Sequence, residues 1–377
     1  MTNITYVFAG NRRNRYLDEN YEAKEFFYGL HNFSSEEYNL EIIEPNNNKF
    51  LSRRLTLLID KFFKKVINLP VYMSDFITIK NLKILFKTDK LILINETTFC
   101  SLAPALLIIG IFKKIDTYVF VMGLYSKKLR FSRLQFLHFF FIRVFNKTVK
   151  KLMFLGDGEL RRAKSIHPKN IDKFLLFPFS VDTDFWSHQK NSKALKSGYI
   201  LFVGNDSNRD PETFLKIVKE LDYIEFKAVT NISSILDADF KNLTVHKGSY
   251  GSSDLSDSEL RDIYSNAKLV ILPLKNSNQP SGQSVTLQAM SCGKPVMISK
   301  TDGFWEEEKF INNREIFFVN NNQVTDWVKN IKTIYNDEEF LKKIEKNALE
   351  LVRNNYNLDI FKTKLLKTLE LVDTQYN

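Results

Sequence analysis

Short apolar runs recur along the second half of the chain, separated by segments with helical periodicity. The runs are rich in β-branched and aromatic residues and are mostly continuous, without a regular alternation of polar positions. They are YILFVG (199–204), EFKAVT (225–230), LTVHKG (243–248), LVILPL (269–274), PVMISK (295–300) and EIFFVN (315–320). Such strands, alternating with helices, are typical of a parallel sheet covered on both faces. The pattern predicts a doubly wound α/β domain.

A second, less regular series of runs occupies the first half of the chain. Its members are ITYVFA (4–9), LEIIE (40–44), KLILIN (90–95), DTYVFV (116–121), KLMFLG (151–156) and FLLFPF (174–179). A polar stretch without periodicity, at 187–198, separates the two series as a linker would. A chain of 377 residues is long enough for two domains. We therefore predict an α/β protein with two tandem Rossmann-like domains, residues 1–187 and 198–355, and a cleft between them.

The loop that follows LVILPL is polar and contains a glycine. Ligands of open parallel sheets bind beyond the carboxyl ends of the strands, where loops lead into helix N-termini. Here KNSNQPSGQ leads into a helix expected to begin near Ser284, whose first N–H groups favour an anion. Gly282 allows a close approach of the backbone, and Ser281 and Gln283 add donors. The alternative is a well-capped helix without a ligand.

A loop of the same kind, FVGNDSNRDPETF, follows the run YILFV. It begins with Gly204, Asn205 and Asp206, and its helix starts at a predicted Asp-Pro cap. Arg209 is expected beside that helix N-terminus, where it would bind a diphosphate through charge-assisted hydrogen bonds. Two such loops in one domain indicate a nucleotide site. Neither loop has the P-loop or the GxGxxG pattern, which argues against ATPases and dinucleotide-binding enzymes.

The composition is that of an ordinary globular protein, with 44% hydrophobic and 26% charged residues. The two cysteines, Cys100 and Cys292, lie far apart and outside any cluster with metal-ligand spacing, which argues against a disulfide framework and a zinc site. The N-terminal sequence lacks a signal-peptide pattern, and no apolar run reaches the roughly 18 residues of a spanning helix. These features predict a cytoplasmic protein.

Four segments, in this order and at the usual distances, resemble glycosyltransferases of the GT-B fold, specifically those of the family 4 type. They are PFSVDTDFW (178–186), YILFVGNDSNRD (199–210), ELRDIYSNAKLVILPL (259–274) and SGQSVTLQAMSCGKPVMIS (281–299). The likeness covers about residues 175–375. In the first half it is weaker and depends on the strand pattern and on AGNRRNRYLDE, near residues 9–19.

The resemblance implies a hexosyltransferase that moves a sugar from a nucleoside diphosphate sugar to an acceptor, with retention and without a metal or other cofactor. The nucleotide would lie in the C-terminal domain and the acceptor in the N-terminal one. A helix over residues 356–377 would pack back on the N-terminal domain. The donor-binding residues implied are Gly204, Asn205, Asp206, Arg209, Lys247, Gly248, Ser281, Gly282, Gln283, Ser284, Val285 and Gln288.

The family's Glu-x7-Glu motif is replaced in this chain. Its two positions fall on Pro280 and Gln288. Gln288 can hydrogen-bond ribose hydroxyls, whereas Pro280 cannot replace a carboxylate, so the sugar contact is expected from Ser281, Gln283 or backbone N–H groups. The loss leaves two alternatives open, a sugar-nucleotide epimerase of the same fold or an inactive homologue.

Residues at strand ends of the first half are further candidates. Gly10 follows the first strand, and Arg12 and Arg13 after it would reach the diphosphate or the acceptor; the alternative is a solvated basic loop. Glu96 follows KLILIN and Asp157 follows KLMFLG. With Arg209, which would stabilise the leaving diphosphate, they are the predicted catalytic residues, although each acid alone could equally be a cap or a surface residue.

Positive charge is concentrated in the first half. The net charge is +10, and residues 1–190 hold 30 Lys and Arg against 18 Asp and Glu. Residues 112–151 contain ten of these cations and only one acid, Asp116. Aromatic and aliphatic residues recur among them at helical spacing; they are Phe136, Leu137, Phe140, Phe141, Val144 and Phe145. This segment is either a peripheral contact with an anionic membrane or a core helix with a basic polar side.

The basic charge and the pI of about 9.2 would also fit a protein that binds nucleic acid or another polyanion. That class needs aromatic residues exposed among the basic ones, whereas here the pattern gathers them on one face. We therefore predict a glycosyltransferase of cell-surface polysaccharide assembly. Its expected partners are a nucleoside diphosphate sugar, a glycan or lipid-linked acceptor and the inner face of the cell membrane, without nucleic acid.

Overall fold

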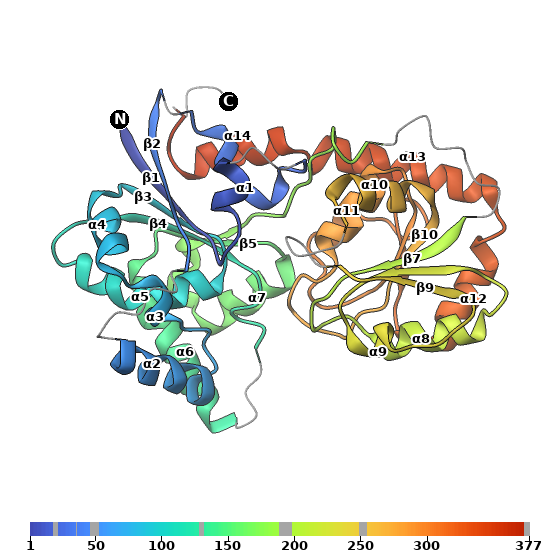
Figure 1. Cartoon of the computed structure of the whole chain (residues 1–377), viewed down its shortest axis with the longest axis horizontal. Helices are drawn as coiled ribbons and strands as arrows, with labels where there is room; N and C mark the ends of the chain where they lie inside the picture. The colour runs from blue at the N-terminus through green and yellow to red at the C-terminus, as the bar shows by residue number, and fades with distance from the viewer. Residues whose placement is uncertain are drawn as a thin grey trace. The chain divides into compact units, whose positions relative to one another are not determined.

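The structure is a computed structural model and describes residues 1–17, 22–34, 36–45, 53–127, 132–187, 198–248 and 255–372. Two parallel sheets of six strands each organise the described chain, one in each of two compact units (Figure 1). All of the apolar runs singled out in the sequence form strands of these sheets. The predicted fold class is thereby confirmed.

The first sheet has the order β2-β1-β3-β4-β5-β6. Its strands are β1 (Thr2–Val7), β2 (Tyr38–Ile43), β3 (Lys90–Leu93), β4 (Asp116–Val121), β5 (Lys151–Phe154) and β6 (Phe174–Leu176). All pairs are parallel, and the strand order reverses between β1 and β3. That reversal places the ends of β1 and β3 at the point where ligands of such sheets bind.

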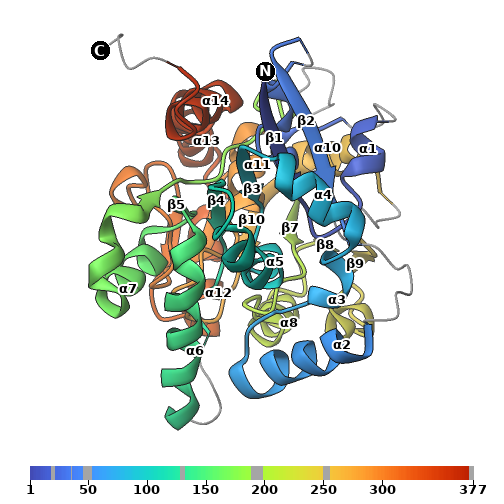
Figure 2. The same cartoon turned by 90° about the vertical axis from the view of Figure 1, so that its left-hand side faces the viewer.

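Helices enclose this sheet, and Figure 2 shows them from a second direction. They are α1 (Arg13–Leu17), α2 (Arg53–Phe62), α3 (Met73–Phe76), α4 (Ile79–Lys87), α5 (Glu96–Ile109), α6 (Ser132–Phe145) and α7 (Asp157–Ile166). One core packs side chains of the strands, such as Val121, against Phe99 of α5 and Ile142 of α6. On the opposite face, Tyr6 of β1 lies 6.0 Å from Phe33 between ring centroids.

The second sheet has the order β12-β11-β10-β7-β8-β9, also parallel throughout. Its strands are β7 (Tyr199–Val203), β8 (Phe226–Val229), β9 (Leu243–His246), β10 (Ala267–Leu272), β11 (Val296–Ser299) and β12 (Phe317–Val319). The order reverses between β7 and β10. The two loops predicted to hold a nucleotide follow these two strands, so the topology brings them together.

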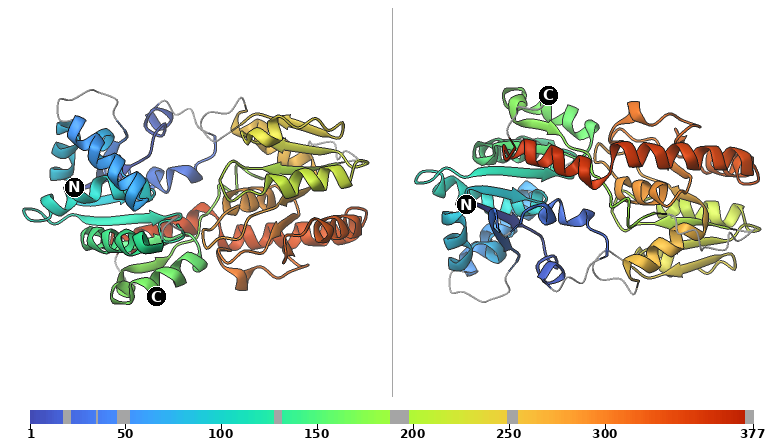
Figure 3. Two further views of the ribbon diagram at one scale, coloured as in Figure 1. Left: turned by 90° about the horizontal axis from the view of Figure 1, so that it is seen from below. Right: turned by 90° about the horizontal axis from the view of Figure 1, so that it is seen from above.

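Helices lie on both faces of the second sheet (Figures 1 and 3). They are α8 (Pro211–Glu220), α9 (Ser233–Leu236), α10 (Asp257–Asn266), α11 (Gln283–Ser291), α12 (Val324–Ile334) and α13 (Glu338–Asn355). A last helix, α14 (Leu358–Thr368), belongs to the second unit up to Thr363 and to the first unit from Lys364 onward. Helices α8 and α12 pack together with Phe214 and Trp327 in the core, and α11 packs on α13.

The two units are not continuous in sequence. The first consists of Met1–Tyr21, Phe27–Phe177 and Lys364–Asn377, and the second of Glu22–Phe26 and Pro178–Thr363. The chain therefore enters the second unit before the linker that the sequence indicates at 187–198. It also sends the short segment Glu22–Phe26 into that unit, which the sequence does not indicate.

The aromatic positions around α6 do not form a single face, because some of them are buried and others are exposed. Phe145 is 3% exposed and packs in the core of the first unit. Phe136 and Phe140 are 70% and 49% exposed. Helix α6 packs an apolar side against the core of the first unit, and part of the predicted aromatic stripe lies on that side. Two cations of the segment, Lys128 and Arg130, lie outside the described residues.

Within the described ranges, no helix is both long enough and apolar enough to cross a membrane.

Candidate functional site

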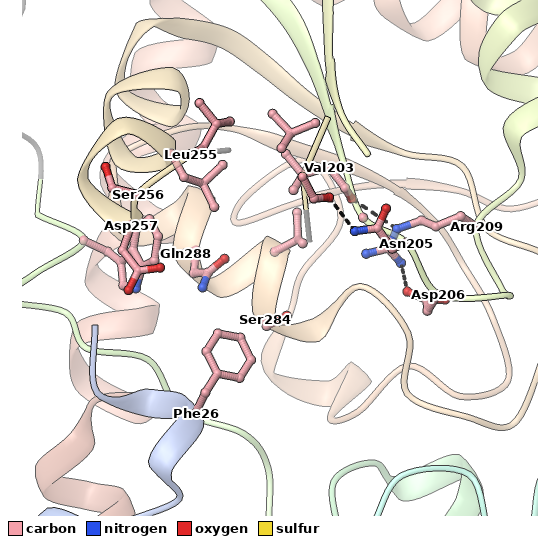
Figure 4. A pocket seen from close by; sticks show the side chains of 16 residues that line it. Phe26, Val203, Asn205, Asp206, Arg209, Leu255, Ser256, Asp257, Ser284 and Gln288 are labelled. Atoms are coloured by element: carbon pink, nitrogen blue, oxygen red, sulfur yellow. Dashed lines mark hydrogen bonds and ion pairs between the residues drawn. The ribbon is translucent and has the colours of Figure 1, made fainter. Parts of the chain in front are cut away.

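A cavity of about 300 Å³ opens in the second unit beside the carboxyl ends of β7 and β8. Eight residues that the sequence predicts for the donor site line it; they are Gly204, Asn205, Asp206, Arg209, Gly248, Ser284, Val285 and Gln288. Figure 4 shows the loop after β7 on one side of this cavity and helix α11 on another. The predicted residues therefore gather at one place.

The loop after β7 is shaped by the packing of an arginine on a glycine. Gly204 has φ +136°, and an added Cβ there would lie 2.2 Å from Nε of Arg209. The Arg209 side chain is 3% exposed, its Nε donates to the carbonyl of Val203 over 3.1 Å, and Nη1 lies 2.7 Å from Oδ2 of Asp206. The Nη1 contact is an ion pair by distance but lacks hydrogen-bond geometry. Burial lowers the pKa of Arg209, although a guanidinium remains charged at neutral pH.

The two predicted loops are bonded to each other. The backbone of Arg209 pairs with Leu274 in an antiparallel bridge, directly after β10. Asn208 Nδ2 donates to Oγ of Ser281 over 2.8 Å, and the N–H of Lys275 donates to the Asn208 carbonyl over 2.8 Å. These bonds hold the two loops as one framework at the sheet edge.

Asn205 joins three loops rather than presenting a free amide. Its Nδ2 donates to the carbonyl of Gly248 over 2.7 Å. Its Oδ1 accepts from the hydroxyl of Thr230 over 3.1 Å and from the N–H of Asn231 over 2.5 Å. The side chain thus connects the loops after β7, β8 and β9.

Helix α11 begins at the cavity. Gly282 caps it with φ +80°, and an added Cβ would lie 3.2 Å from Cδ1 of Ile298, so a larger residue would be strained there. Ser284 and Val285 in its first turn line the cavity, where the N–H groups of a helix start attract anions. Ser281 and Gln283 are buried, at 8% and 5% exposure, and do not line it.

Besides Ser281, Gly282 and Gln283, one more predicted donor residue lies outside the cavity lining. Lys247 follows β9, is exposed, and is not among the lining residues, although its neighbour Gly248 is. The strand ends at His246, and the chain turns so that only the glycine reaches the cavity.

Gln288 contacts a buried glutamate that the sequence does not indicate. Its Nε2 donates to Oε1 of Glu25 over 2.9 Å, and the same oxygen accepts from Nε1 of Trp186 over 2.7 Å. Glu25 is 2% exposed, and burial raises its pKa to about 7, against the lowering effect of these hydrogen bonds. The hydroxyl of Tyr264 lies 3.4 Å from Oε1 of Gln288.

The start of α10 completes the cavity with Leu255, Ser256 and Asp257. Ser256 caps the helix in a capping box with Glu259. Asp257 accepts from the N–H of Ala23 over 3.4 Å, so the segment Glu22–Phe26 lies against this helix end. Its Phe26 also lines the cavity, with its ring toward Ser284 in Figure 4.

In the first unit, hydrogen bonds to other residues of the same unit hold the predicted basic loop in place. Gly10 has φ +146°. The N–H groups of Arg12 and Arg13 donate to Oε1 of Glu44 over 2.6 and 3.1 Å, and Nη1 of Arg12 donates to the Gly10 carbonyl over 3.2 Å. These bonds fix the loop beyond β1 and β2.

The two predicted catalytic acids of the first unit both start helices. Asp157 opens α7 and forms an ion pair with Arg161 one turn later. Glu96 opens α5, and its buried Oε2 has no hydrogen-bond partner among the described residues. A third acid, Glu159, is fully buried and accepts from the N–H of Tyr125 over 2.8 Å; burial raises its pKa to about 8.

No three His, Cys, Asp or Glu side chains of the described chain are grouped as a metal site requires.

Residues 238–351 match the family described as "Glycosyl transferases group 1". No curated protein matches the sequence. Among solved structures, sucrose-phosphate synthase from Thermosynechococcus elongatus is similar with a TM-score of 0.67 at 11% identity, over 98% of this chain and 99% of that one. HepE from Anabaena, in complex with UDP and glucose, has a TM-score of 0.67 at 11% identity, over 99% and 100%.

TarM from S. aureus, in complex with fondaparinux, alpha-GlcNAc-glycerol and UDP, has a TM-score of 0.56 at 13% identity, over 76% of this chain and 58% of its own. At these identities the structures show the fold, and the family match covers part of the second unit. Together they confirm the resemblance noted in the sequence.

Proposed function

We propose that this chain, a glycosyltransferase of the GT-B fold, moves a hexosyl group from a nucleoside diphosphate sugar to a glycan or lipid-linked acceptor. We further propose that it retains the anomeric configuration and uses no metal ion or other cofactor. One observation carries the donor site: the loop after β7 and the start of α11 are bonded together and line one cavity.

The charged and polar groups of the cavity indicate how a bound donor would be oriented in it. The diphosphate would lie near Arg209 and Ser284, where a guanidinium and the first N–H groups of α11 favour an anion. The ribose would lie near Gln288, one turn further along the helix. The base would then lie against the apolar side, beside Val229 and Leu255.

The same groups supply the chemistry of transfer. When the bond between the anomeric carbon and the diphosphate oxygen breaks, negative charge grows on the leaving group, while the acceptor oxygen forms the new bond and passes its proton to the departing diphosphate oxygen. Arg209 and the start of α11 are fixed before the reaction and stabilise that charge. A cationic side chain and a helix dipole are therefore proposed in the role that a metal ion has in other transferases.

The replaced glutamate position narrows the possible sugar contacts. The hydroxyl of Ser281 accepts from Asn208, and Gln283 is buried away from the cavity. The backbone N–H groups at the start of α11 are then the groups that we propose for the sugar.

Binding and turnover test this function in two steps. Calorimetry with UDP, GDP, ADP and dTDP should give saturable binding of at least one of them to the purified chain. The corresponding nucleotide sugars should then be hydrolysed slowly without an acceptor. Conversion of the sugar nucleotide to its epimer would instead favour an epimerase, and binding without turnover would favour an inactive homologue. Failure of all four nucleotides to bind would overturn the donor site.

An exposed apolar surface on the first unit supports a membrane-bound acceptor. We call it the aromatic patch; it consists of Leu58 and Phe62 of α2 and Phe136 and Phe140 of α6, each between 48% and 70% exposed. A series of aromatic rings connects the two helices. The ring centroid of Phe63 lies 5.7 Å from that of Phe62 and 4.9 Å from that of Phe141. The ring centroids of Phe141 and Phe140 are 5.6 Å apart.

Exposed cations accompany the aromatic patch on the same helices and just beyond them; they are Lys61, Lys65, Arg143 and Lys147. Aromatic residues among cations suit the headgroup region of an anionic bilayer. We propose that this surface attaches the enzyme to the inner face of the cell membrane, where a lipid-linked acceptor of polysaccharide assembly would be found.

A further inference from the structure

The segment Glu22–Phe26 forms part of the cavity wall although the rest of the second unit begins at Pro178. Oε2 of Glu22 accepts from the N–H of Ser258 over 2.7 Å, at the start of α10. The ring of Phe26 lies 5.4 Å from that of Phe179. Contacts at both ends therefore hold the segment in place, with Glu25 between them.

Glu25 is held in an unusual way for a carboxylate. It is 2% exposed, and its Oε1 accepts two hydrogen bonds, from Trp186 and from Gln288. Its Oε2 is buried and has no hydrogen-bond partner among the described groups. Burial of a carboxylate is costly, so a residue placed in this way is expected to have a role beyond packing.

The role follows from the chemistry of the two partners. A carboxylate only accepts, so it bonds the nitrogen of the Gln288 amide and not the oxygen. This fixes the amide orientation, which an isolated glutamine lacks. The Oε1 of Gln288 has one long contact, 3.4 Å from the Tyr264 hydroxyl, and one further N–H remains on Nε2.

We propose that Glu25 is a positioning residue for nucleotide recognition: it fixes Gln288 so that the cavity presents one acceptor and one donor to the two vicinal hydroxyls of the ribose. One hydroxyl donates to Oε1 of Gln288, and the other accepts from Nε2. This role rests on the proposed function. The pair Glu25–Gln288 then replaces the single glutamate that the resemblance leads one to expect at position 288.

The test compares UDP with 2′,3′-dideoxy-UDP by calorimetry, or the matching guanosine or adenosine pair if that base binds best. The ratio of the two affinities measures recognition of the hydroxyls. Glu25→Ala should reduce this ratio roughly 3- to 10-fold, because it releases the amide. Glu25→Gln keeps an oxygen that accepts hydrogen bonds from Trp186 and Gln288, so this variant should retain most of the wild-type ratio. Glu22→Gln, in the same segment, is the control and should leave the ratio unchanged.

A charge swap distinguishes positioning from packing. Gln288→Glu alone places two carboxylates within hydrogen-bond distance and should lower both UDP affinity and the ratio. The double variant Glu25→Gln with Gln288→Glu restores one amide and one carboxylate and should recover the ratio. A purely structural role would lower the melting temperature of Glu25→Ala without changing the ratio, and the swap would recover nothing.

The outcomes separate two failures. If the wild-type chain binds none of the four nucleoside diphosphates, the proposed function is overturned and this role with it. If it binds UDP but Glu25→Ala keeps the full ratio, the role of Glu25 alone is overturned. If Glu25→Ala fails to fold, the double variant provides the test. A folded double variant that does not recover the ratio lost in Gln288→Glu also overturns the role of Glu25.

Discussion

Gly10 and Gly204 occupy equivalent places in the two sheets but have different surroundings. Each follows the strand beside which the strand order reverses, and their φ angles are +146° and +136°. An added Cβ at Gly10 would meet nothing within 4 Å, whereas at Gly204 it would lie 2.2 Å from Nε of Arg209. The backbone geometry comes from the topology, but of these two glycines only Gly204 has a charged side chain in the space that a Cβ would take.

The contrast extends to the rest of the two edges. In the second unit, Asn208 and Ser281 join two loops around one cavity. In the first unit, Arg12 and Glu44 also join two loops, those after β1 and β2, whereas Asp157 pairs with Arg161 within its own helix. Both edges thus have loops bonded to each other, and the second is distinguished by the buried Arg209 and the cavity beside it.

The largest effect is expected from alanine at the two glycines. Gly10→Ala should cost about 1 to 3 kcal/mol of unfolding free energy, the cost of an unfavourable φ. Gly204→Ala adds the clash with buried Arg209 and should cost about 3 to 5 kcal/mol, with loss of nucleotide binding. Urea unfolding and calorimetry measure both. Equal costs at the two positions would show that Arg209 moves aside, and the comparison would fail.

Two buried glutamates, Glu25 in the second unit and Glu159 in the first, should give each unit its own pH dependence. The pKa of Glu25 is raised to about 7 and that of Glu159 to about 8, both mainly by burial. When folding raises the pKa of a carboxyl group, the contribution of that group to stability is fully present below its unfolded pKa of 4.5. This contribution is lost as the pH rises to the pKa of the folded state. For Glu25 the loss is on the order of 3 kcal/mol.

Urea unfolding between pH 4.5 and 8.5 measures this loss. Glu25→Gln should remove the loss of stability that is complete near pH 7. Glu159→Gln should remove a loss of stability that continues to about pH 8. Stability that stays constant over this range in the wild-type chain would contradict the raised pKa values.

Arginines at the two edges should differ in their effect on nucleotide binding. Arg209→Ala should weaken binding by about 1.5 to 3 kcal/mol, the contribution of a charge-assisted hydrogen bond. Arg13→Ala is the matched variant in the first unit. If Arg13→Ala weakens binding equally, the first edge also takes part in diphosphate binding, as the sequence suggests. Unchanged affinity in Arg209→Ala would remove this residue from the site.

The smallest effect concerns the membrane. Each basic residue near an anionic surface contributes about 1 kcal/mol, which salt screens. The chain should float with anionic vesicles at low salt and not with neutral vesicles or at high salt. Phe136→Ser with Phe140→Ser should reduce flotation, and Tyr223→Ser, which removes a ring that is 67% exposed in the second unit, should not. A chain that never floats would leave the aromatic patch without its proposed occupant.

Local patterns predicted the strands well, because continuous apolar runs such as YILFV need cover on both faces and only a central parallel strand has it. They also predicted eight of the cavity-lining residues, since strand ends and helix starts are visible in the sequence. They could not predict Glu25, whose bond to Gln288 spans 263 positions. Nor could they show that the Asn205 amide joins three loops, because that depends on where β8 and β9 end.

Helix α14 has a consequence for synthesis of the chain. The first unit includes residues from Lys364 onward, and there Leu365 and Leu369 are fully buried and Nζ of Lys150 donates to Glu370 over 2.6 Å. Phe177 and Lys364 are separated on the ribosome by roughly 10 to 40 s of translation at common elongation rates. The unit that emerges first thus waits, with part of its apolar surface uncovered, until the second has been made. A chaperone that binds nascent chains would find its target on the apolar surface of the first unit that Leu365 and Leu369 later cover.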